Sequence, residues 1–253
     1  SDASLKLWLD ASHSNSVVKD GSNNVSKWMD LSGNGNDGIA NLGQEPTFDD
    51  DGYNGKNTLV FNSSNKDSFA LQSNNLLSGE YSVFFVTESN SNSEGALLSQ
   101  YYVANGRTLI RVNQDGNNGF YVWSGQSGGN KNRITDQTQV VNQPYIATVV
   151  KDGMAVDAWL DGGARTNTPV TFGYNAPTVT NYIGKIVDNR NGNIHIPYNG
   201  KISEIIVFNS ALTDDQIIEI QNYLAKKWDL ESTVDSDGDG VADASDFAPT
   251  DSN

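Results

Sequence analysis

The chain has 253 residues, with 16 Lys and Arg against 31 Asp and Glu, and a formal net charge of −15 at pH 7. This charge repels phosphate backbones and anionic lipid, so it argues against nucleic acid and membrane surfaces as partners. No apolar run reaches the ~18 residues that a membrane span needs, and we expect no membrane insertion. The absence of Cys excludes thiol catalysis, disulfides and zinc sites built from Cys.

Short apolar or alternating runs recur along the chain, separated by clusters of Gly, Asn, Asp and Ser. The runs are rich in Val, Ile, Phe, Tyr and Trp, which is typical of β-strands. We expect strands at 5–9, 58–61, 81–86, 107–112, 119–123, 145–150, 154–160 and 201–208. Asp152-Gly153 predicts a tight hairpin turn in which both residues have positive φ. About a dozen strands at this spacing predict an all-β fold, a jelly-roll β-sandwich.

One amphipathic helix is predicted near the C-terminus. Thr213 and Gln216 have the spacing of a capping box, and two Asp residues follow Thr213 at the positive end of the helix dipole. An apolar face recurs at helical spacing and comprises Ile217, Ile220, Leu224 and Trp228. We expect this face to pack on the sandwich.

Beyond Leu230 the composition becomes rich in Asp, and we interpret 231–234 as a linker and the rest as a small separate element. Counting Asp235 as position 1 of a loop places oxygen ligands at the spacing used for Ca²⁺, with Gly240 at the sharp bend. The predicted metal ligands are Asp235, Asp237, Asp239, the backbone carbonyl of Val241, Asp243 and Asp246. Position 12 of an EF-hand is normally Glu, and Pro249 leaves no room for an exiting helix.

These features resemble a thrombospondin type 3 calcium repeat and, more loosely, half a dockerin. Residues 251–253 look like the start of another such loop, so the resemblance implies a truncated repeat at 231–253; the alternative is a solvated acidic tail. Without a cation the carboxylates repel one another, and we expect the loop to lose order while the sandwich stays folded. Calcium affinities of about 10⁻⁴–10⁻³ M serve outside cells, which predicts a secreted or bacterial cell-surface protein.

The rest of the chain carries a second resemblance. The segments 7–12, 25–38, 199–208, 211–213 and 223–228 resemble bacterial laminin-G-like domains of the concanavalin A-like lectin/glucanase superfamily. The resemblance implies a jelly roll of two antiparallel sheets and a domain spanning 1–230. This fold carries enzymes, lectins and spacers alike, so the activity must be argued from individual residues.

Evidence for catalysis is weak in this sequence. Glycosidases of this superfamily carry paired carboxylates on one strand face, and no Glu here stands in a Glu-x-Asp arrangement. His195 and Tyr198, with Arg190 nearby, imitate a polysaccharide lyase but lie in a polar loop. We therefore expect a protein that is not an enzyme and has no catalytic residues.

Polar loops with aromatic and charged residues favour a binding role, through stacking and hydrogen bonds. The candidate ligand-binding residues are Tyr53, Asp115, Trp123, Arg133, Tyr174, Asp188 and Arg190. The sequence predicts a calcium-dependent, non-catalytic module that binds a glycan or cell-surface ligand, such as part of an adhesin. Residues 1–3 lack signal-peptide character, and we expect a monomeric module within a larger chain. A structural spacer and a polysaccharide hydrolase or lyase remain as alternatives.

Overall fold

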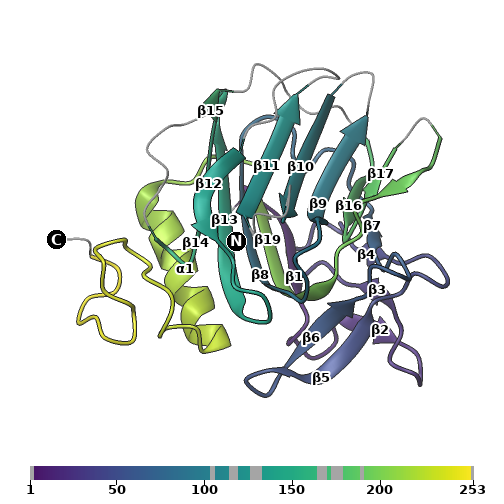
Figure 1. The fold of residues 1–253 in the computed structure, drawn as a ribbon, viewed down its shortest axis with the longest axis horizontal. Coiled ribbons are helices and arrows are strands. Elements are labelled where there is room, and N and C mark those ends of the chain that lie inside the picture. The colour runs from purple at the N-terminus through teal and green to yellow at the C-terminus, as the bar shows by residue number, and fades with distance from the viewer. Residues whose placement is uncertain are drawn as a thin grey trace.

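The computed structural model describes residues 3–102, 106–113, 119–125, 133–163, 170–171, 179–188 and 191–251. Two large antiparallel sheets stack face to face in a jelly-roll sandwich, and one helix covers the outer face of one sheet (Figure 1). This arrangement confirms the predicted fold class. No helix in the described part of the chain is long and apolar enough to cross a membrane.

The first sheet, called sheet A, has the strand order β15-β14-β13-β8-β19-β6-β5, with β1 also paired to β19. Its strands are β1 (Leu5–Asp10), β5 (Thr47–Tyr53), β6 (Lys56–Phe61), β8 (Tyr81–Ser89), β13 (Pro144–Asp152), β14 (Ala155–Leu160), β15 (Val170–Thr171) and β19 (Gly200–Phe208). The first and last strands of the domain therefore lie side by side, with Trp8 opposite Ile206.

The second sheet, called sheet B, has the order β12-β11-β10-β9-β16-β7-β4-β3-β2. Its strands are β2 (Val17–Lys19), β3 (Val25–Trp28), β4 (Gly38–Ile39), β7 (Phe69–Leu71), β9 (Gly95–Tyr102), β10 (Gly106–Val112), β11 (Gly119–Gly125), β12 (Arg133–Thr138) and β16 (Asn181–Ile183). A small hairpin, β17 (Ile186–Val187) and β18 (Ile194–His195), follows β16.

Side-chain alternation assigns the two faces of sheet A. On β8, Val83 and Phe85 point into the core between the sheets, whereas Phe84 and Val86 join a second apolar layer beneath the helix. Successive residues of a strand point to opposite faces, so the central strands of sheet A are covered on both sides. This explains why β8 and β19 each contain four consecutive apolar residues, Val83–Val86 and Ile205–Phe208, rather than an alternating pattern.

The helix α1 (Asp214–Trp228) supplies the other half of that second layer. Its capping box is formed, because the Gln216 amide donates to Thr213 Oγ1 at 3.4 Å and the Thr213 amide donates to Gln216 Oε1 at 3.0 Å. The predicted apolar face is confirmed: Ile217, Leu224 and Trp228 are buried against sheet A, with Ile220 partly buried beside them.

A buried ionic cluster fixes the last turn of α1 on sheet A. The Lys227 ammonium lies 2.6 Å from Asp10 Oδ2 and 2.7 Å from Glu204 Oε2. The indoles of Trp8 and Trp228 donate to the two oxygens of Glu204 at 2.8 and 2.7 Å. Glu204 stands at a β-bulge of β19, which aims its side chain at the helix.

The eight predicted strands all occur, and their ends differ from the predicted ones by at most three residues. The predicted hairpin turn is wrong by one residue. Asp152 pairs with Ala155 as the last residue of β13, so the turn consists of Gly153 and Met154. Only Gly153 of the predicted pair has positive φ, at 54°, as expected for glycine at the first turn position of a two-residue hairpin.

Candidate metal loop and binding pocket

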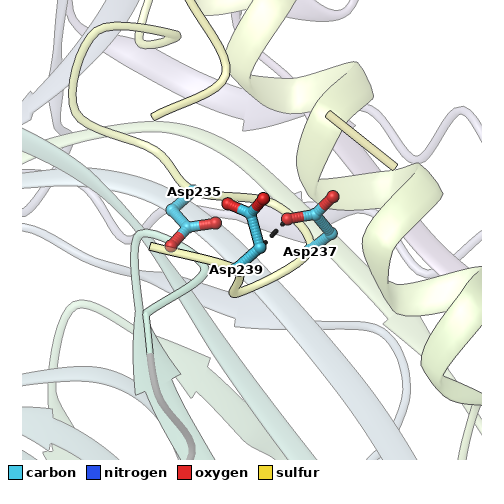
Figure 2. Close-up of side chains that lie close together, drawn as sticks. All are labelled: Asp235, Asp237 and Asp239. Carbon is cyan, nitrogen blue, oxygen red and sulfur yellow. Dashed lines mark hydrogen bonds between the residues drawn. The ribbon is translucent and has the colours of Figure 1, made fainter. Parts of the chain in front are cut away.

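The acidic segment after α1 brings three carboxylates together. Asp235, Asp237 and Asp239 each offer an oxygen, and these three atoms lie within 4.8 Å of one another (Figure 2). Two glycines in the loop allow the three carboxylates to approach one another: Gly238 and Gly240 have φ of 77° and 97°. Such angles are accessible to glycine at little cost, and they fold the alternating Asp residues inward.

Backbone amides hold the three carboxylates in place. The amides of Gly238 and Gly240 donate to the two oxygens of Asp235 at 2.8 and 2.9 Å. The Asp239 amide donates to Asp237 Oδ1 at 3.2 Å, the contact dashed in Figure 2, and the Val241 amide donates to Asp239 Oδ1 at 2.8 Å. Each bond leaves lone pairs on the same oxygens for a cation, since a carboxylate accepts about four.

Two further observations fit a hard divalent cation. Asp237 Oδ2 and Asp246 Oδ2 are buried carboxylate oxygens without a hydrogen-bond partner. Burial raises the pKa of Asp237, and the charges of Asp239, Asp246 and Asp235 raise it further. A buried oxygen without a donor is costly unless a cation neutralises it. The residues present therefore fit Ca²⁺, whose ligands are oxygens.

The other predicted ligands lie in different positions. Asp243 is buried, and its two oxygens accept from the Ser236 amide at 2.7 Å, the Ser236 hydroxyl at 2.6 Å and Asn222 Nδ2 at 3.2 Å. Asp243 therefore connects the two ends of the loop and bonds the loop to α1, and it is not one of the three clustered carboxylates. Val241 is exposed. The negative charge of Asp246 raises the pKa of Asp237. Asp246 Oδ1 accepts a hydrogen bond from the Ala248 amide at 2.8 Å.

The loop is docked on the sandwich rather than standing apart from it. Val234, in the predicted linker, is fully buried in the apolar layer under α1. The Asp235 amide donates to the carbonyl of Asp161 at 2.9 Å. The next residue, Gly162, approaches so closely that a Cβ there would lie 1.7 Å from the carbonyl oxygen of Asp235. The turn after β14 and the loop thus form one packed unit.

A separate pocket lies on the outer face of sheet B. Alternation on β10 places Ile110 in the inter-sheet core and Leu109 on the outer face, in a small apolar cluster with Ile186. The register sets Trp123 of β11 opposite Leu109, and Tyr101 of β9 opposite Arg107. The pocket has a volume of about 180 Å³ and is lined by Tyr101, Arg107, Leu109, Arg111, Trp123, Ile186, His195 and Ile196.

Arginine side chains lie against the aromatic rings in this pocket. The guanidinium carbon of Arg107 is 3.7 Å from the ring centroid of Trp123 and 5.6 Å from that of Tyr101. Arg111 lies 4.8 Å from the Trp123 ring and forms an ion pair of 3.2 Å with Glu94. The predicted role of Trp123 as a stacking surface changes accordingly, because Arg107 already covers one of its faces.

The predicted ligand-binding residues do not form one site. Trp123 lies in the pocket, and Asp188 is buried in the turn of the neighbouring β17–β18 hairpin. Tyr53 is on sheet A, packed in the layer under α1. Arg133 begins β12, and its side chain is outside the described part, as are Asp115, Tyr174 and Arg190 entirely.

Sequence reasoning missed Arg107 and Tyr101, and it considered His195 only as part of a possible lyase site. The available signal was a pair of Arg residues four apart on a strand of a strongly acidic chain, which places both on one face. The two candidate lyase residues lie in different environments. Tyr198 is fully buried, and its hydroxyl donates to the Glu88 carbonyl at 2.8 Å, whereas His195 is exposed.

The Laminin_G_3 family model, described as the concanavalin A-like lectin/glucanases superfamily, matches residues 62–218. The chain belongs to this family. No curated protein matches it in sequence. The matched region runs across the centre of both sheets and as far as the start of α1.

Solved structures share this fold. Domain 4 of AbnA, a GH43 extracellular arabinanase from Geobacillus stearothermophilus solved in complex with arabinotriose, superposes with a TM-score of 0.59 at 21% identity, covering 84% of this chain and 96% of that one. Trypanosoma rangeli sialidase in complex with the inhibitor DANA gives 0.55 at 13% identity, covering 84% and 32%. A mutant of that sialidase displaying trans-sialidase activity gives 0.57 at 11%, covering 90% and 34%. This chain spans about a third of the sialidases' length, and these likenesses show the fold alone.

Proposed function

We propose that this chain is a non-catalytic carbohydrate-binding module, stabilised by Ca²⁺, of a larger secreted or surface-attached bacterial protein such as an adhesin. The observation that carries the proposal is the pocket of Tyr101, Arg107 and Trp123 on the outer face of sheet B. Small-molecule sites combine apolar and aromatic walls with a few placed polar groups, as here. Domain 4 of AbnA, which shares the fold, was solved in complex with arabinotriose, and that complex is consistent with a sugar ligand here.

The placement of the acidic groups supports a role without catalysis. Glu204 is 1% exposed and bonds to Lys227, Trp8 and Trp228, so it belongs to the packing of α1. Glu94, which lies beside the pocket, is paired with Arg111. Hydrolysis with two carboxylates needs a facing pair in the pocket, and the pocket lining among the described residues contains no carboxylate.

Calcium is the cation that we assign to the loop of 235–246, with Asp235, Asp237, Asp239 and Asp246 as side-chain ligands. Bound there, it would neutralise their charges and hold the loop closed. The support is the triad within 4.8 Å and the partnerless oxygens of Asp237 and Asp246. An affinity near 10⁻⁴–10⁻³ M would be satisfied only outside cells, which is the basis for proposing a secreted or surface location. We treat 231–253 as a thrombospondin type 3-like unit docked on the 1–230 sandwich.

Two measurements on the intact chain test the proposal. Calorimetric titration with CaCl₂ should show one site, which Asp237→Asn abolishes and Asp50→Asn, an equal change of charge at an exposed position, leaves intact. A glycan array in calcium should give reproducible hits without release of reducing ends or unsaturated products. Silence on the array would favour a spacer, whereas released products would overturn the non-catalytic role.

A further inference from the structure

Arg107 places a positive charge in the lining of this pocket. The chain carries about twice as many acidic as basic residues. Five basic residues form ion pairs with carboxylates in the described part of the chain: Lys27, Lys56, Arg111, Lys201 and Lys227. Among the described residues, no carboxylate forms an ion pair with Arg107, and its Nε is buried without a hydrogen-bond partner. Its described contacts include the Trp123 ring and the Tyr101 hydroxyl, which lies 3.5 Å from Arg107 Nη1.

The surroundings of Arg107 hold its guanidinium in one orientation. Stacking at 3.7 Å on Trp123 fixes the plane of the group, and the Tyr101 ring flanks it at 5.6 Å. A fixed guanidinium presents parallel N–H donors that match the two oxygens of a carboxylate or sulfate. Less side-chain entropy is lost on binding when the donor is already ordered. The group is thus prepared for an oxyanion that the described residues do not supply.

The shape of the pocket limits what carries that oxyanion. Its volume of about 180 Å³ lies below the ~300 Å³ of typical drug-sized sites, so it holds one ring-sized unit rather than a long ligand. Leu109, Ile186 and Ile196 form an apolar floor, and the exposed His195 stands at the edge. A sugar ring offers an apolar face for the floor and polar substituents for the rim.

We propose that this pocket selects an acidic saccharide, with Arg107 binding the carboxylate or sulfate of one sugar unit. This inference rests on the proposed carbohydrate-binding function and names the ligand class for the same site. Electrostatics favours such a ligand only locally, because the net charge of −15 repels polyanions elsewhere. Recognition therefore depends on the contact with Arg107 rather than on general attraction.

Calorimetry on the intact chain in calcium tests the assignment with three probes: tri-galacturonate, neutral galactotriose and a sulfated galactan. At least one acidic probe should bind at least 10-fold tighter than the neutral one. Arg107→Gln should weaken that binding about 10- to 100-fold, the effect of losing one charge-assisted hydrogen bond pair. Lys19→Gln is the matched control, since Lys19 also lies over an aromatic ring, 4.8 Å from the Phe48 centroid, on a distant strand; it should change nothing.

Arg107→Lys keeps the positive charge but loses the paired N–H donors of the guanidinium, so it should weaken binding to an intermediate degree. This variant serves as the test if Arg107→Gln does not fold. Affinity of the unmodified chain should also fall as salt rises, because the contact is ionic. Equal binding of neutral and acidic probes would overturn the acidic assignment and leave the carbohydrate module standing. Binding of no probe would count against both the carbohydrate-binding function and the acidic ligand. If binding depends on Arg107 but is unchanged in Asp237→Asn, this inference stands and the calcium role does not.

Discussion

Docking of the acidic loop predicts that calcium stabilises the whole sandwich, and Gly162 offers the means of testing this. Gly162→Ala places a Cβ 1.7 Å from the carbonyl oxygen of Asp235, a backbone atom, at a φ of 71°. The contact can be relieved only by moving the loop away. Gly153→Ala is the matched control, because its φ of 54° imposes a similar strain of about 1–2 kcal/mol while nothing lies within 4 Å of the new Cβ.

The size of the effect follows from linkage. With a dissociation constant of about 10⁻⁴–10⁻³ M, about 10 mM calcium adds roughly 1.4–2.7 kcal/mol to the free energy of unfolding. For a domain of this size that corresponds to a rise in Tm of about 3–11 °C. Calorimetric melting should show this rise in the unmodified chain and in Gly153→Ala, and a much smaller one in Gly162→Ala. A full calcium shift in Gly162→Ala would refute the coupling, and so would binding of calcium without any shift in the unmodified chain.

Two buried charges give further predictions. Lys227→Met leaves Glu204 and Asp10, with side chains 1% and 5% exposed, without their cation, and should cost about 3–5 kcal/mol in urea unfolding at pH 7. Burial already raises the pKa of Glu204, and losing Lys227 raises it further, so the cost should shrink as the pH falls and Glu204 protonates; a small, pH-independent cost would show that water screens the cluster. Burial, and the nearby charge of Glu45, raise the pKa of Asp67 to about 6. A raised folded pKa contributes stability below the unfolded value of about 3.9 that is lost as the pH rises through 6. Asp67→Asn should therefore be more stable than the unmodified chain at pH 7.5 and not at pH 4, and equal differences at both pH values would contradict the assignment.

Local sequence patterns predicted the elements of this fold well, because their causes are local. The capping box of Thr213 and Gln216 and the apolar spacing of α1 depend on residues within a few turns. Two carboxylates near strand ends also bond local amides: Asp10 accepts from the Ser12 amide and Asp30 from the Ser32 amide, each at 2.9 Å. The hairpin turn failed by one residue, since strand pairing extended through Asp152.

The pocket was not predictable in the same way, because it depends on register between strands. Tyr101, Arg107 and Trp123 belong to three strands, and they converge only when Arg107 lies opposite Tyr101 and Leu109 opposite Trp123. A shift of one residue would turn both Arg107 and Leu109 into the core. Composition could identify aromatic and charged residues as candidates, but it placed Tyr53 and Trp123 in one group although they lie on different sheets.

The same separation limits what calcium can do for binding. The acidic loop packs against α1 and the turn after β14, on the outer side of sheet A (Figure 1). The pocket lies on the outer side of sheet B. The inter-sheet core stands between them. A cation bound in the loop could therefore not bridge to a ligand in the pocket, and it would act on binding only by raising the population of folded sandwich. Calcium dependence of glycan binding should consequently follow the stability of the domain, becoming strong near its Tm and weak far below it.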